Sequence, residues 1–207
     1  MDGVAGGERD GLLDPAWSFV ARPDLESITA EEWAVLDRQR AGFVAATQAE
    51  RALGWLRAMA GSPSFGYEIN IYRHCLQTAT RMLRDGLPEE TVVVGLLHDC
   101  AFEAAPATHG LIAAALLGPH CSEADGWMLA HHQIFQDFHC HHHPGLDPGA
   151  RERWRGHPHF EWTARFVARY DQTTISAGGE ALPLAAFEPM VARFFARPPR
   201  PLALALA

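Results

Sequence analysis

A wholly apolar segment that ends in two ionisable residues places the strongest constraint on how this chain can fold. Residues 92–97 are Val-Val-Val-Gly-Leu-Leu, and His98 and Asp99 follow directly. Pro88 and two glutamates precede the segment, where the first turn of a helix favours proline and negative charge. A helix that is apolar on all sides is expected to be buried. Burial of an imidazole and a carboxylate at its end is costly without partners, and a divalent metal ion is the simplest partner for both groups.

Helical patterns continue over most of the chain, and no alternating strand pattern or internal repeat occurs. A capping box of Thr29 and Glu32 begins the first helix, and Asp85-Gly86 ends the second. We expect helices over residues 31–60, 71–84, 88–99, 110–117, 122–138, 158–170 and 184–195, with a loop over 139–156. The predicted fold class is therefore all-α, a single helical bundle over residues 29–196 with an N-terminal extension (1–28) and a C-terminal tail (197–207).

Charge and composition exclude several function classes. The net charge of −8 disfavours nucleic acid as a partner, and the 17 basic residues include no lysine, which excludes Schiff-base and Walker-type chemistry. No stretch approaches the roughly 20 apolar residues of a membrane span, so no membrane partner is expected. Residues 1–11 lack the basic and apolar regions of a signal peptide, and the four cysteines form no CxxC pair. A cytoplasmic protein, monomer or homodimer, is expected.

Histidine is the residue type that suggests a function, with 12 copies. Almost every predicted helix of the central region contributes a residue of a type that binds metals. These residues are His74, His98, Asp99, His109, His131, His132 and Asp171. Helical bundles build metal sites from inward side chains on facing helices. The pattern predicts a metal site inside the bundle.

This order of residues resembles the HD-domain superfamily of metal-dependent enzymes over about residues 67–195. The resemblance implies four ligands for a first metal ion, namely His74, His98, Asp99 and Asp171. Asp99 would also be the catalytic carboxylate that bridges to a second ion. His109 and His132 would complete the second position, with His131 as the alternative ligand or as a neighbour facing the substrate.

Two stretches are similar to the mixed-valent di-iron oxygenase branch, which includes myo-inositol oxygenase and aminohydroxyethylphosphonate oxygenase. Tyr67-Glu68-Ile-Asn precedes the first ligand, and Phe166-Val-Ala-Arg-Tyr-Asp ends on the last one. The resemblance implies two iron ions, Fe(II) and Fe(III), and oxidation of a small hydroxylated or phosphonate-type substrate by O2. Family members often continue His-Asp-Leu-Gly-Lys, whereas this chain continues His98-Asp-Cys-Ala-Phe-Glu, so inositol is not the expected substrate.

Two other functions remain open. The first is a phosphohydrolase that uses Mn, Mg, Fe or Zn to cleave a nucleotide or a small phosphate ester. The second is a helical module that senses a metal or ligand without turnover. Metal content and phosphate release separate these hypotheses from the oxygenase.

Candidate substrate-binding residues are those near the predicted ligands or in the matching loop. They are Tyr67, Glu68, His131, Gln136, His142 and Arg169. Several have a plain structural alternative. Either Gln133 or Gln136 could reach the site or belong to a polar helix face, the histidines at 139–143 could form a solvated loop, and Arg169 could form a surface ion pair.

Overall fold

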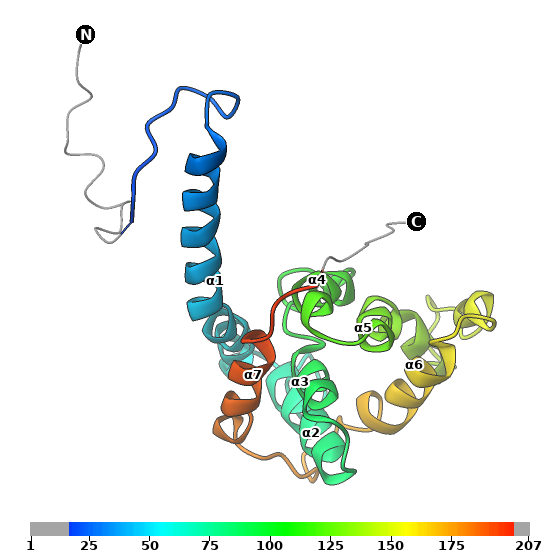
Figure 1. The fold of residues 1–207 in the computed structure, drawn as a ribbon. Helices are drawn as coiled ribbons and strands as arrows, with labels where there is room; N and C mark the ends of the chain where they lie inside the picture. The colour runs from blue at the N-terminus through cyan, green and yellow to red at the C-terminus, as the bar shows by residue number, and fades with distance from the viewer. Residues whose placement is uncertain (1–16, 201–207) are drawn as a thin grey trace. The chain divides into compact units, whose positions relative to one another are not determined.

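The computed structural model of this protein describes residues 17–200. Within them all regular structure is helical and no strand occurs (Figure 1), which confirms the all-α fold class. The chain divides into two compact units, Met1–Thr47 and Gln48–Ala207. Residues 1–16 of the predicted extension and 201–207 of the predicted tail lie outside the described residues, and the predicted domain bounds stay a prediction. No described helix has the length and apolarity needed to cross a membrane.

The first unit contains the predicted capping box. Helix α1 (Ala30–Ala58) begins there and continues into the second unit. The backbone N–H of Thr29 donates to Oε2 of Glu32 at 2.9 Å, and the N–H of Glu32 donates to Oγ1 of Thr29 at 3.3 Å. Trp17 packs edge-on against Phe43, with ring centroids 5.8 Å apart. The reciprocal cap satisfies two backbone donors at the helix start, as expected from the Thr-x-x-Glu pattern.

Every other predicted helix is present in the second unit. The α-helices are α2 (Ile71–Arg84), α3 (Glu89–Leu97), α4 (His109–Leu117), α5 (Glu123–Gln136), α6 (Phe160–Phe166) and α7 (Glu188–Phe195). Some features differ from expectation. The predicted helix 184–195 is divided into a short helix, η7 (Leu184–Ala186), and α7. The predicted loop 139–156 contains a short helix, η5 (Ala150–Trp154), and the predicted helix 158–170 continues beyond α6 as a π-helix, η6 (Val167–Asp171).

Helix α3 is the buried centre of this unit. All seven of its residues from Thr91 to Leu97 are buried, as the apolar pattern predicts. α2, α5 and α7 pack against it, while α4 packs on α5 and α5 on α6 (Figure 1). The end of α3, where His98 and Asp99 follow, therefore lies deep within the bundle.

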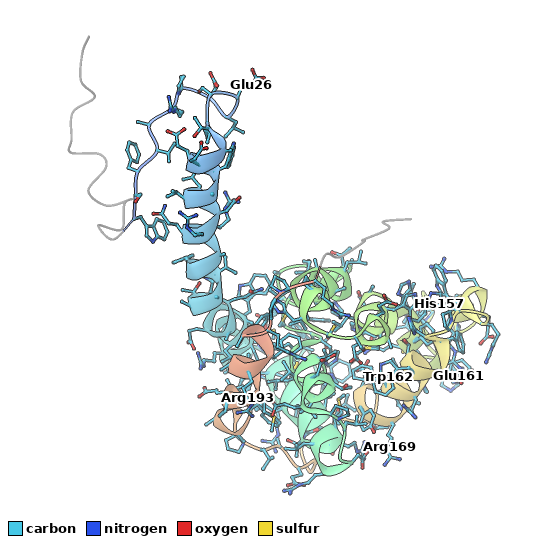
Figure 2. The ribbon with its side chains drawn as sticks, viewed as in Figure 1. Glu26, His157, Glu161, Trp162, Arg169 and Arg193 are labelled. Carbon is cyan, nitrogen blue, oxygen red and sulfur yellow. The ribbon has the colours of Figure 1, made fainter. Side chains whose placement is uncertain are left out.

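The buried carboxylate of Asp125 links three helices. Its Oδ2 accepts from Ser122 Oγ at 2.9 Å and from Thr91 Oγ1 at 3.2 Å, and its Oδ1 accepts from Trp162 Nε1 at 2.9 Å. Trp162, labelled in Figure 2, belongs to α6, Thr91 to α3, and Ser122 caps α5. Asp125 thus ties α5 to α3 and α6, three of the helices around the candidate ligands.

We expect Asp125→Ala to lower the free energy of unfolding by about 3 kcal/mol, because it leaves buried donors on α3 and α6 without an acceptor. Glu123→Ala is the matched control, since Glu123 is an exposed acid in the same first turn and should change stability by less than about 0.5 kcal/mol. Denaturant unfolding followed by circular dichroism measures both. Equal stability of the two variants would contradict the structural role of Asp125.

Candidate metal centre

Six candidate ligands from separate helical segments converge inside the second unit. His74 comes from α2, His98 and Asp99 follow α3, His109 begins α4, His132 lies on α5 and Asp171 ends η6. None of the six exposes more than 7% of its surface. These six residues, from His74 to Asp171 along the sequence, build one buried polar cluster, which we call the ligand cluster.

The four imidazoles of the ligand cluster are oriented in the same way. Each Nδ1 donates a hydrogen bond of 2.8–2.9 Å to a backbone carbonyl. The acceptors for His74, His98, His109 and His132 belong to Thr174, Gly95, Pro106 and Leu129, respectively. Because a carbonyl only accepts, each Nδ1 must carry the proton, and each Nε2 of the neutral ring presents a lone pair to the cluster. Such backbone bonds are typical of histidines that bind metals.

Asp99 divides the ligand cluster into two halves. Its Oδ1 lies 2.9 Å from His109 Nε2 and 3.3 Å from His132 Nε2. Its Oδ2 lies 3.5 Å from His98 Nε2 and 3.7 Å from His74 Nε2. One carboxylate oxygen therefore faces each histidine pair.

Asp171 belongs to one half only. Its Oδ1 lies 3.4 Å from His74 Nε2 and 3.7 Å from His98 Nε2. The half with His74, His98 and Asp171 forms what we call the first position, and the half with His109 and His132 forms the second position. Asp99 is shared by both.

The Nε2 atoms need a cation between them. His74 Nε2 lies 3.2 Å from His98 Nε2, and His109 Nε2 lies 3.0 Å from His132 Nε2. Two lone pairs cannot satisfy each other, and the neighbouring carboxylate oxygens also only accept. A proton or a metal ion resolves this arrangement. His74, His98 and Asp171 have ligand atoms within 4.8 Å of one another, as do His98, Asp99 and His132, so the residues fit a metal site.

The carboxylates alter the protonation of the histidines. Burial alone would lower the pKa of His74, but its contacts with Asp171 and Asp99 outweigh burial and raise the pKa to about 9. The pKa of His109 is also raised, since Asp99 outweighs burial there. Burial alone would raise the pKa of Asp99, but the charge of His98 and hydrogen bonds from His109 and His132 lower it well below its usual range. Without a metal, His74 is therefore protonated at neutral pH, and its charge offsets part of the negative charge of the two carboxylates.

We expect metal affinity at the first position to rise by about tenfold per pH unit from pH 7 to about 9 and then to level off. A metal ion needs neutral His74, so below its raised pKa the ion must displace a proton. Calorimetry of Mn²⁺ binding in two buffers with different ionisation enthalpies measures the proton released. An affinity that is constant over this pH range would contradict the raised pKa of His74.

A glycine permits the second position to form. Gly110 follows His109 on α4, and a Cβ there would lie 2.6 Å from the carbonyl oxygen of Leu129 and 3.0 Å from Cε1 of His132. Only glycine lets α4 approach α5 this closely without displacement of the backbone. The close approach brings His109 Nε2 within reach of His132 Nε2.

A cavity of about 370 Å³ borders the ligand cluster. Four of the candidate ligands line it, namely His74, Asp99, His109 and Asp171. Its apolar wall consists of Ile69, Ile71, Phe102 and Ile175, and its polar wall includes Tyr67, Gln136, His139, Cys140 and Gln172. The cavity has the size of a small-molecule site.

The candidate substrate residues fall into two groups. Tyr67 and Gln136 line the cavity. Glu68 is exposed and accepts from the backbone N–H of Ala177 at 2.7 Å, so it joins two loops next to the cavity. Nε2 of Gln136 donates to both oxygens of Asp171.

Glu68 and the other three candidates do not line the cavity. His131 stacks on Trp127, with ring centroids 4.0 Å apart. His142 is exposed in the loop after α5, and Arg169, labelled in Figure 2, pairs with Asp85 at 2.7 Å. The structure brings His132, not His131, into the ligand cluster.

Several residues around the ligand cluster have little or no signal in the sequence. Thr174 supplies the carbonyl that orients His74, and Phe102, Cys140 and Gln172 line the cavity. Gln172 directly follows Asp171, which is the only sequence signal for it. Thr174 and Phe102 carry no pattern that separates them from ordinary core residues.

Comparisons with known proteins add no assignment. No family model matches this chain, and no curated protein matches it either. The resemblance to the HD-domain superfamily therefore stays a prediction.

Proposed function

We propose that this chain is a two-metal enzyme of the HD-domain type. The observation that carries the proposal is the position of Asp99, whose two oxygens face different histidine pairs. His74, His98 and Asp171 would hold the first ion together with Asp99. His109 and His132 would hold the second ion, also with Asp99.

We further propose that the two ions are iron and that the reaction oxidises a small hydroxylated substrate with O2. A set of four imidazoles and two carboxylates without a thiolate suits iron, manganese or zinc. The proposal of iron rests on the similarity of the Tyr67-Glu68 stretch and the Asp171 stretch to the oxygenase branch. When bound, an iron pair supplies the redox chemistry that dioxygen requires.

The cavity wall supports an oxygenase over a phosphohydrolase. None of the described residues that line the cavity is an arginine, and the chain has no lysine. Sites that bind phosphate or phosphonate groups usually provide such cations. The wall therefore favours an uncharged hydroxylated substrate, and its isoleucines make one side of the cavity apolar.

The chain's own residues would orient and shield the substrate. Tyr67 lies at the opening of the cavity, where it is 62% exposed, and Phe102 forms part of the apolar wall of the cavity.

The four cysteines are free thiols, which supports the proposal of a reducing, cytoplasmic location.

Metal analysis of protein purified without oxygen tests the proposal. We expect two iron ions per chain and a paramagnetic signal of the mixed-valent pair that changes when a substrate is added. Oxygen consumption with a panel of small polyols and amino alcohols then identifies the substrate class.

Two results would overturn the proposal. Release of phosphate from generic esters with Mn²⁺ or Mg²⁺, without oxygen consumption, would identify a phosphohydrolase. Protein that holds no metal after reconstitution with iron, manganese and zinc would refute the metal centre itself.

A further inference from the structure

Two glutamines on α5 form hydrogen bonds at different halves of the ligand cluster, one with a candidate ligand and one with the backbone beside a candidate ligand. Gln133 and Gln136 follow His132 and are three residues apart, so they lie on neighbouring parts of one helix face. Both are partly buried. Their hydrogen bonds, however, lead to opposite sides of Asp99.

Gln136 contacts the first position. Its Nε2 donates to Oδ1 and to Oδ2 of Asp171, each at 2.8 Å. A carboxylate only accepts, so the amide must direct its NH2 group toward Asp171. Oδ1 of Asp171 is also the atom that faces His74 and His98. The amide thus restricts rotation of the carboxylate that would bind the first ion.

Gln133 contacts the second position. Its Nε2 donates to the carbonyl oxygen of Pro106 at 3.1 Å, and its Oε1 accepts from the backbone N–H of Gly110 at 3.4 Å. The same Pro106 carbonyl accepts from His109 Nδ1 at 2.9 Å. Gln133 therefore holds the backbone on both sides of His109 and fixes the carbonyl that orients its ring.

We propose that Gln136 is a positioning residue for the first metal position and that Gln133 is one for the second. This inference rests on the proposed two-metal function. Partners that orient metal ligands typically change metal affinity by roughly 10- to 100-fold when they are removed. Because each glutamine contacts one half only, each substitution should weaken one position and spare the other.

Gln136→Met and Gln133→Met test this inference, since methionine keeps the length and the unbranched shape but has no amide. Gln48→Met on α1 is the matched control outside the ligand cluster. Affinities of both positions for Fe(II) are measured by competition with a chelator, and Mössbauer spectra identify which iron remains. Asp171→Asn and His109→Ala provide reference spectra for a damaged first and second position.

We expect Gln136→Met to lose roughly 10- to 100-fold in affinity at the first position and to match the Asp171→Asn spectrum. Gln133→Met should lose as much at the second position and match the His109→Ala spectrum. Gln48→Met should retain both affinities. If a methionine variant does not fold, the leucine variant at the same position replaces it.

Metal binding by the wild-type protein distinguishes a failure of the positioning inference from a failure of the proposed two-metal function. If the wild-type protein binds two irons but both variants keep both affinities, or both weaken the same position, the positioning inference is wrong and the two-metal function stands. If the wild-type protein binds no metal, the proposed two-metal function is refuted, and the inference about the two glutamines is refuted with it.

Discussion

Asp99→Ala is expected to lose both metal ions and all measurable turnover. Asp99 directs one oxygen to each histidine pair, so under the proposed function its removal would take a ligand from both positions at once. The affinity at each position should fall by more than about 100-fold, because even partners outside the ligand set cost roughly 10- to 100-fold. Elemental analysis after anaerobic reconstitution with iron measures the loss.

His132→Ala separates this effect from general damage to the fold. His132 Nε2 faces Oδ1 of Asp99 and His109, and it belongs to the second position. The variant should therefore retain about one iron per chain, held by the first position. Full metal content in both Asp99→Ala and His132→Ala would refute the assignment of these ligands.

Gly110→Ala should destabilise the protein and empty the second position. A methyl group there would lie 2.6 Å from the Leu129 carbonyl, so α4 must move away from α5. Overpacking of this kind costs about 1 to 3 kcal/mol, which exceeds the gain of about 0.5 to 1 kcal/mol that alanine brings to a helix. The displacement would also carry His109 away from His132. Thermal unfolding and iron content measure the two effects.

Gly126→Ala is the matched control for this substitution, because Gly126 lies on α5, the helix against which α4 packs. A Cβ at Gly126 would lie 3.8 Å from the Cα of Gly118, an ordinary contact. This variant should gain about 0.5 to 1 kcal/mol in stability and keep both metals. If Gly110→Ala has the same stability and metal content as Gly126→Ala, the second position does not require the close approach of α4 to α5.

The local signals for helix ends allowed α2 to be predicted accurately. The pattern predicts residues 71–84, and the structure has Ile71–Arg84. Asn70 caps the start through a bond from the N–H of Arg73, and Gly86 adopts the left-handed φ of 75° that ends the helix. These signals act within a few residues of the helix ends, so the sequence contains them fully.

The faces of the later helices were harder to predict. His131 and His132 are about 100° apart around α5, and the packing of α5 against its neighbouring helices decides which one faces the ligand cluster. Arg169 lies two residues before Asp171, and residues with this spacing point to different sides of a helix. Its partner is Asp85 at the surface.

By itself the sequence determined that this chain forms helices and that imidazoles and carboxylates follow or interrupt its apolar faces, since periodicity and capping are local properties. Only the tertiary structure decided that the two oxygens of Asp99 face two different histidine pairs, and that Gln133 and Gln136 form hydrogen bonds at opposite halves of the ligand cluster. Distances between side chains on different helices depend on how closely the helices pack, and no local pattern specifies that approach.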